Sequence, residues 1–254
     1  MLSPAKTGFS LQSTGIVQPR FFKLLLLMKP PFFILIGLLF VLIAISALSK
    51  TGRKGHSQEH MTGHHRFEDA DKWAAIFEDP ERDAWQKPEE VIRSIGIQSG
   101  TTIADIGSAT GYFPVRFARV ARTGQVYGVD IEQTLVDYLN TRAVREQLPN
   151  LVSILGDEDD PRIPEKVDLV FICDTYHHIQ DRSTYFENLK KYMQPQARLV
   201  VVDFKKGDLP VGPSDEMKLA ETEVIKELTE TGYRLLPNSV ELPYQYVLVF
   251  NIEY

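Results

Sequence analysis

Short apolar runs recur after residue 100, and most are followed by a stretch whose apolar residues have a helical spacing. Runs rich in Val, Ile and Leu are typical of strands that are buried on both faces of a parallel sheet. We expect such strands at residues 102–106, 125–130, 151–155, 167–173 and 198–204. Helices are expected at residues 112–120, 132–147 and 181–193, and a shorter one at 89–95 after Pro88. This alternation predicts an α/β fold.

The C-terminal part departs from the alternation. A long helix is expected over residues 215–231, ended by Gly232, and two further strands follow at 233–241 and 245–252. Strands that are joined by a turn of a few residues pair antiparallel. The sheet is therefore expected to close with an antiparallel hairpin.

The beginning of the chain has a different pattern. Residues 30–49 contain no charged side chain, and almost all of them are apolar. A helix of about 20 residues spans the hydrocarbon core of a bilayer, so residues 1–50 are predicted to form a tail and a single transmembrane anchor helix. A cleaved signal peptide and a true start at Met28 are the alternatives. Basic residues flank both ends of the apolar stretch, so charge does not define its orientation.

Residues 51–66 are polar and basic and hold four of the six histidines: His56, His60, His64 and His65. Two histidines four residues apart can bind a metal, which is one interpretation. A flexible linker is the other, and we favour it because no set of carboxylates and cysteines accompanies the histidines. No metal site is therefore predicted.

Composition narrows the functional classes. The chain has 254 residues and a formal net charge of −6. The first 66 residues carry eight Lys and Arg and one acid, so residues 67–254 hold 13 more negative than positive charges. An acidic domain repels a phosphate backbone, which argues against nucleic acid as a partner. The single cysteine, Cys173, excludes an intrachain disulfide framework.

The turn after the first expected strand carries the candidate chemistry. Asp105 stands two residues before Gly107, and small residues follow at alternate positions through Ala109 to Gly111. Glycines let the backbone bend and let a ligand approach the N-terminus of the next helix. The dinucleotide fingerprint G-x-G-x-x-G would need glycine where Ala109 and Tyr112 stand.

This turn resembles the first motif of the class I S-adenosylmethionine-dependent methyltransferases, with Ala109 where the family more often has glycine. The resemblance covers residues 88–254 and implies a Rossmann-like seven-stranded sheet with an antiparallel last strand, and S-adenosylmethionine as the cofactor. In the family, acids at the positions of Asp130 and Asp157 bind the ribose hydroxyls and the adenine amino group. The cofactor-binding residues that the resemblance implies are Asp105, Gly107, Ala109, Gly111, Asp130, Ile131, Asp157 and Asp174.

The resemblance also gives residues 67–87 a role. A segment before the first strand commonly lies over the cofactor cleft in this family, so we interpret these residues as a lid. Its side chains Trp73, Phe77, Arg82 and Trp85 would then face the substrate. The alternative is that the aromatic residues only attach the segment to the domain.

The loop after the fourth strand holds the candidate catalytic residues Tyr176, His177 and His178. In the family this loop lies beside the transferable methyl group, and a histidine can accept a proton near neutral pH. The alternative is that the histidines only shape the loop. The methyl donor is already activated, so positioning can supply most of the rate of an in-line displacement.

Two other functions stay open: an NAD(P)-binding oxidoreductase and a non-catalytic adenosyl-binding scaffold at the membrane. A short-chain oxidoreductase needs a Tyr-x-x-x-Lys pair, which Tyr185 and Tyr192 do not form. The anchor and the aromatic lid favour a small-molecule or lipid-like acceptor. Because S-adenosylmethionine does not cross bilayers freely, the catalytic domain is expected on the cytoplasmic side. The sequence leaves the oligomeric state open.

Overall fold

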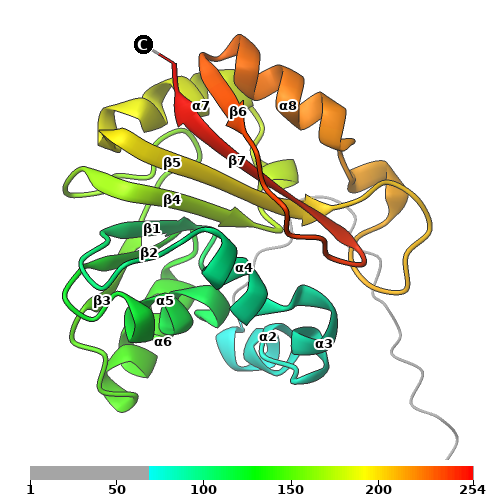
Figure 1. The fold of residues 1–254 in the computed structure, drawn as a ribbon. Helices are drawn as coiled ribbons and strands as arrows, with labels where there is room; N and C mark the ends of the chain where they lie inside the picture. The colour runs from blue at the N-terminus through cyan, green and yellow to red at the C-terminus, as the bar shows by residue number, and fades with distance from the viewer. Residues whose placement is uncertain (1–68, 254) are drawn as a thin grey trace, which may run out of the picture. The chain divides into compact units, whose positions relative to one another are not determined.

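The computed structural model describes residues 69–253, and within them seven strands form one sheet (Figure 1). The strand order is β3-β2-β1-β4-β5-β7-β6. Strands β1 to β5 are parallel, whereas β7 is antiparallel to both β5 and β6. The strands are β1 (Ile103–Ile106), β2 (Val126–Asp130), β3 (Leu151–Leu155), β4 (Val167–Cys173), β5 (Met193–Phe204), β6 (Tyr233–Leu236) and β7 (Gln245–Ile252). The predicted seven-stranded sheet is confirmed.

Helices cover both faces of the sheet (Figure 1). One face packs against α4 (Pro88–Ser94), α5 (Tyr112–Val120) and α6 (Gln133–Arg145), and the other against α7 (Arg182–Leu189) and α8 (Glu221–Glu230). Leu169 and Phe171 of β4 belong to the first core, while Val170 and Ile172 belong to the second. Successive residues of a strand point to opposite faces, which is why β4 is apolar at consecutive positions from Leu169 to Ile172.

Parallel pairing brings the functional segments to one edge of the sheet. Ile106 at the end of β1 pairs with Val129 on one side and with Ile172 on the other. The glycine turn, Asp130 and the loop after β4 therefore lie together at the carboxyl ends of the strands. Ligands of open α/β sheets bind at this edge.

Two short helices precede the sheet domain, α2 (Ala70–Phe77) and α3 (Glu81–Gln86). Asp69 caps α2 by accepting a hydrogen bond from the Lys72 N–H over 3.1 Å. Figure 1 shows the pair beside the ends toward which β1 and β4 run. Both helices lie within residues 67–87, the segment interpreted above as a lid.

Four expected boundaries were wrong. The helix expected at residues 181–193 ends as α7 at Leu189 and is followed by a 3₁₀ turn, Lys190–Tyr192. The helix predicted for residues 215–231 is instead a single 3₁₀ turn, Asp215–Met217, followed by the separate helix α8. The two are separate because the backbone of the buried Lys218 is extended, and its Nζ donates to the Gly207 carbonyl over 2.7 Å. Strand β6 ends before Pro237, which has no N–H for a sheet ladder. Strand β5 begins at Met193 rather than residue 198, because Met193 already pairs with Val167 of β4.

Within residues 69–253 no helix is long and apolar enough to span a membrane. The predicted anchor and the His-rich linker lie outside the described residues.

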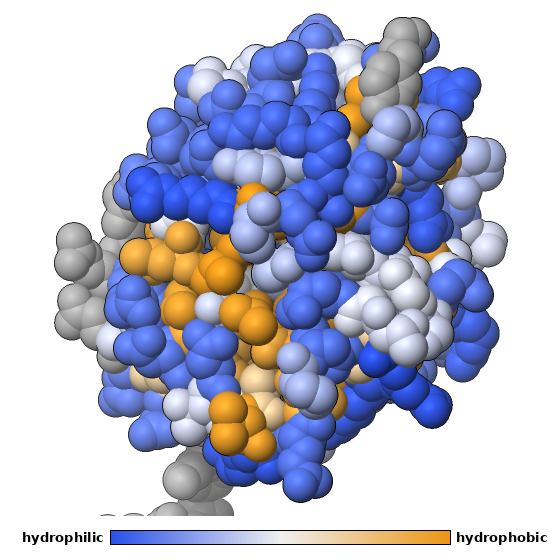
Figure 2. All heavy atoms as spheres, turned by 90° about the vertical axis from the view of Figure 1, so that its left-hand side faces the viewer, coloured by the Kyte–Doolittle hydropathy of each residue, from blue (hydrophilic) through white to orange (hydrophobic). Residues whose placement is uncertain are grey.

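Figure 2 shows the face on the left of Figure 1, where hydrophobic surface interrupts a largely hydrophilic one. Exposed apolar side chains of the described region include Val120, Val144, Val152 and Leu155. The candidate site described below lies at the carboxyl ends of the strands.

Candidate active site

The turn between β1 and α5 is built on left-handed backbone. Gly107 and Gly111 have φ angles of +72° and +98°, and Ala109 also has a positive φ, +46°. A Cβ on Gly107 would collide with the side chain of Thr175, and one on Gly111 would collide with Leu139. The N–H groups of Gly107 and Ser108 donate to the Val129 carbonyl over 2.8 and 3.0 Å, which binds the turn to β2.

Asp130 fixes the same turn from the tip of β2. Its Oδ2 accepts from the Ala109 N–H over 2.9 Å, and its Oδ1 accepts from the Glu132 N–H over 3.0 Å. The residue is 8% exposed. Burial raises the pKa of Asp130 to about 6, although these backbone hydrogen bonds act in the opposite direction.

Two further carboxyl groups of the predicted site lie nearby. Asp105 is 3% exposed, and burial raises its pKa, while the positive charge of Arg82 lowers it. Burial also raises the pKa of Asp174 to about 6, and Arg82 again opposes the shift. In addition, Ser108 Oγ is buried in the turn without a hydrogen-bond partner.

These features fit a cationic nucleoside. The N-terminus of α5 begins at the turn, and Asp105, Asp130 and Asp174 supply negative charge that burial makes costly. Each oxygen of Asp130 retains a lone pair for a ligand hydroxyl after its backbone hydrogen bond. The chain can therefore hold the sugar and the positively charged part of S-adenosylmethionine at this edge.

Arg82 of α3 reaches the same edge through a closed ring of hydrogen bonds. Its Nη2 donates to Asp174 Oδ2 over 3.3 Å, and its Nε donates to Gln86 Oε1 over 3.1 Å. Gln86 donates to Gln245 at the start of β7, and Gln245 donates to Asp174. Gln86 and Gln245 are 0% and 1% exposed. The ring connects the predicted lid with the ends of β4 and β7.

Two ion pairs hold the same segment to the helices. Glu78 pairs with Arg142 of α6 over 2.6 Å, and Asp83 pairs with Arg116 of α5 over 2.9 Å. The Tyr112 hydroxyl also donates to Asp83. These contacts are separate from the Arg82 ring and attach α2 and α3 to the domain.

The aromatic residues of the predicted lid divide into two groups. Trp85 packs against Phe204 and Tyr244, with ring centroids 5.8 and 6.2 Å apart. Trp73 stacks on Phe77 within α2 at 5.4 Å. For Trp85 these contacts favour the attachment interpretation, whereas an acceptor contact of Trp73 and Phe77 stays a prediction.

His177 forms a buried pair with Asp203 at the end of β5. The His177 Nδ1 lies 3.0 Å from both carboxylate oxygens, and the two side chains are 3% and 0% exposed. Burial lowers the pKa of His177, but the hydrogen bond and charge of Asp203 outweigh it and raise the pKa overall. His178 is exposed, and its ring centroid lies 4.2 Å from that of His177.

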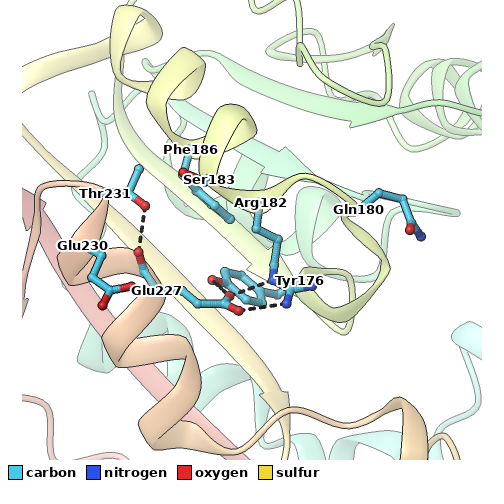
Figure 3. Close-up of a pocket in the computed structure, with 8 residues that line it drawn as sticks. All are labelled: Tyr176, Gln180, Arg182, Ser183, Phe186, Glu227, Glu230 and Thr231. Carbon is cyan, nitrogen blue, oxygen red and sulfur yellow. Dashed lines mark hydrogen bonds and ion pairs between the residues drawn. The ribbon is translucent and has the colours of Figure 1, made fainter.

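Tyr176 lies in the core on the α7 and α8 side. It lines a cavity of about 220 Å³ that Figure 3 shows between these helices. The Tyr176 hydroxyl donates to Glu227 Oε2 over 2.8 Å, and Arg182 binds the same carboxylate over 2.7 Å. None of the glycine-turn residues lines this cavity, so the structure gives Tyr176 a packing role, and its contact with the acceptor stays a prediction.

The remaining predicted residues lie at the ends of β2 and β3. Ile131 follows Asp130 and is 54% exposed, which leaves it open to a ligand at this edge. Asp157 follows β3 and forms an ion pair with Arg162. An adenine contact of Asp157 stays a prediction.

Sequence reasoning missed Asp203, Gln245 and Gln86. Asp203 carried a signal, since it is a carboxylate at the end of an otherwise apolar strand. The two glutamines carried none, because their partners are remote in the sequence and nothing local marks them.

The family described as a methyltransferase domain matches residues 97–239. The chain therefore belongs to this family. The crystal structure of an S-adenosylmethionine-dependent methyltransferase from Aquifex aeolicus is similar, with 28% identity and a TM-score of 0.67; the match covers 72% of this chain and 98% of that one. The cofactor of this methyltransferase domain is S-adenosylmethionine.

Two curated relatives are also similar. An uncharacterized methyltransferase of Schizosaccharomyces pombe is 29% identical over 43% of this chain and 41% of its own length. The ubiquinone/menaquinone biosynthesis C-methyltransferase UbiE of Haemophilus ducreyi is 27% identical over 44% of each chain. The chain thus spans less than half the length of these relatives.

The sheet itself argues against the oxidoreductase alternative. A dinucleotide fold has the strand order 3-2-1-4-5-6, whereas here the antiparallel β7 lies between β5 and β6.

Among residues 69–253 no group of three or more His, Cys, Asp and Glu side chains is arranged to hold a metal ion.

Proposed function

We propose that the protein transfers the methyl group of S-adenosylmethionine to a small, apolar, membrane-associated acceptor. The observation that carries the proposal is the position of Asp130, whose carboxylate is fixed by the N–H of Ala109 at the edge where the glycine turn opens. The cofactor supplies an activated methyl group when bound. The chain supplies position, charge and the exclusion of water.

Each part of the edge has a defined task in this proposal. Asp130 binds the sugar hydroxyls, and Asp105 and Asp174 provide negative charge for the cationic end of the cofactor. The segment formed by α2 and α3 covers the edge and excludes water, since it is attached on both sides of Arg82. Holding the reacting atoms in line can account for most of the rate enhancement.

Two observations support the acceptor class. The H. ducreyi relative is named for quinone biosynthesis, and residues 30–49 form an apolar stretch long enough to anchor the chain in a membrane. An anchored enzyme meets acceptors that partition into the bilayer. We therefore propose a quinone-like or lipid-like acceptor and a domain on the cytoplasmic side.

His177 is the candidate general base, and Asp203 is its positioning residue. If His177 Nδ1 carries the proton that faces Asp203, Nε2 is left as an acceptor for a proton from the substrate. The second interpretation, in which the pair only holds the loop after β4, requires no proton transfer. The Asp203 variant described in the Discussion separates the two.

Methyl transfer from labelled S-adenosylmethionine to a fractionated membrane lipid extract tests the proposal. The full chain should place label in the organic phase, and Asp130→Ala should not. Asp137→Ala is the matched control, because Asp137 is an exposed aspartate on α6. A wild-type protein that binds S-adenosylmethionine but labels no fraction would support the scaffold alternative instead.

A further inference from the structure

Arg82 places a positive charge at the edge where the cofactor is expected to bring one. Its guanidinium lies 3.3 Å from Asp174 and acts electrostatically on the buried Asp105. The Arg82 side chain is 14% exposed, and its guanidinium carbon lies 3.9 Å from the centroid of the Tyr112 ring. The lid residue is thus held inside the cluster of acids.

The contacts of Arg82 explain why the acids tolerate burial without a ligand. Buried carboxylates are stable only when they are paired or protonated. Among the charges near Asp174, Arg82 has the largest effect on its pKa, and at Asp105 the charge of Arg82 lowers the pKa while that of Asp130 raises it. A cation that arrives from solution would take over the same task.

We propose that Arg82 is an internal counter-ion that S-adenosylmethionine must displace, and that this makes it the residue that sets the preference between the cofactor and its product. The inference rests on the proposed cofactor site. S-adenosylmethionine and S-adenosylhomocysteine share the nucleoside, the ammonium and the carboxylate, and differ in the methyl group and the charge of the sulfonium. Two positive charges a few ångströms apart repel, so a retained guanidinium penalises the sulfonium form and not the thioether.

The attachment of the lid allows this exchange. The Glu78–Arg142 and Asp83–Arg116 pairs do not involve Arg82 and can persist when it leaves Asp174. When Arg82 withdraws, its bonds to Asp174 and Gln86 break, but Gln245 remains bonded to both Asp174 and Gln86. Arg82 can therefore withdraw by a side-chain rotation while α2 and α3 stay attached.

The test is the ratio of the affinities for the two ligands, measured by isothermal titration calorimetry on the full chain. Arg82→Met removes the charge and should raise the affinity for S-adenosylmethionine about fivefold or more relative to that for S-adenosylhomocysteine. Arg82→Lys keeps the charge and should leave the ratio near that of the wild type. Arg93→Met is the control, because Arg93 is an exposed arginine on α4.

Thermal unfolding gives a readout that does not depend on activity. Without ligand, Arg82→Met should unfold at a lower temperature, because Asp174 loses its ion pair. Saturating S-adenosylmethionine should recover more of this loss than saturating S-adenosylhomocysteine. If Arg82→Met does not fold, Arg82→Gln, which can still donate a hydrogen bond to Asp174, serves the same comparison.

Two results would overturn the inference while leaving the cofactor site in place. If Arg82→Met lowers the affinities for both ligands by the same factor, Arg82 binds a group that the two ligands share, such as the carboxylate. If the ratio does not change, the guanidinium does not sense the sulfonium. A wild-type protein that binds neither ligand would instead contradict the proposed function, and this inference with it.

Discussion

The Ala109 backbone N–H donates to Asp130 Oδ2 over 2.9 Å, which joins the turn after β1 to the tip of β2. The carboxylate that shapes the turn is therefore the one that we propose binds the ribose. Under this proposal sugar binding and turn geometry are coupled, since Asp130 also accepts from Glu132 and cannot rotate without losing a backbone hydrogen bond.

Cofactor affinity should fall as the pH is lowered. Asp130 and Asp174 have pKa values of about 6, and protonation removes the negative charge that a cation requires. Between pH 7 and pH 5 the dissociation constant for S-adenosylmethionine should rise about tenfold or more. Calorimetry across this range measures the change. In Asp174→Asn the dissociation constant should depend less on pH than in the wild type. An affinity that is constant over the range would contradict the assigned role of the acids.

The same pKa shifts act on stability with a defined sign. Because the folded pKa of Asp130 lies above its ordinary value of 3.8, ionisation opposes folding. Without ligand, the contribution of this group to stability is complete below about pH 4 and is lost as the pH rises through 6. The free energy of unfolding of the Asp130→Asn variant, measured with urea, should not show this loss as the pH rises.

Gly107→Ala should destabilise the protein more than Gly96→Ala. Both glycines have positive φ, +72° and +62°, so both substitutions strain the backbone by roughly 1–2 kcal/mol. A Cβ on Gly107 also collides with Thr175, whereas one on Gly96 meets nothing within 4 Å. We expect a further cost of about 1–3 kcal/mol at Gly107 in urea unfolding. Equal costs would show that Thr175 yields without penalty.

Arg142→Met should loosen the segment formed by α2 and α3. Arg142 binds Glu78, Glu146 and the Thr110 carbonyl, and its side chain is 13% exposed. The substitution removes the ion pair of Glu78, which keeps only the Thr110 hydroxyl, whereas Glu146 keeps its pair with Arg119, so we expect a cost of about 1–3 kcal/mol. Hydrogen exchange of residues 70–86 should accelerate. The control is Arg145→Met, because Arg145 is 61% exposed and lies 3.9 Å from the same Glu146.

Asp203→Asn should lower the pKa of His177, because the hydrogen bond and charge of Asp203 are what raise it. NMR titration of the imidazole is the direct readout. In the wild type, this pair stabilises the fold below the ordinary histidine pKa of 6.5, and the stabilisation is lost as the pH rises through the raised value. If His177 is the base, the pH profile of kcat should shift with its pKa. An unchanged profile would leave the pair a purely structural role.

Local sequence signals predicted the sheet and the glycine turn well. Strands β3 and β4 lie at their expected residues, because each is an apolar run bounded by polar or turn-forming residues. The turn was visible because Gly107, Ala109 and Gly111 are close in sequence, and a left-handed backbone requires small residues there.

The features that were missed depend on contacts between remote residues. The break before α8 follows from the bond between Lys218 and Gly207, which no helical propensity encodes. Gln86 and Gln245 meet across 159 positions, so neither has a local signature. The bond of Tyr176 with Glu227 in the core also had no local signal, and the predicted contact of Tyr176 with the acceptor stays a prediction.

Calorimetric titration of S-adenosylmethionine into the wild type, Asp130→Asn and Asp137→Asn tests the central claim most directly. Asp130→Asn keeps the size of the side chain but removes the charge and one of the two acceptors of backbone hydrogen bonds, so thermal unfolding should first establish that the variant is folded. We expect binding to the wild type and to Asp137→Asn, and a loss of about 30-fold or more for Asp130→Asn. Wild-type affinity in Asp130→Asn, or no binding to any of the three proteins, would contradict the claim.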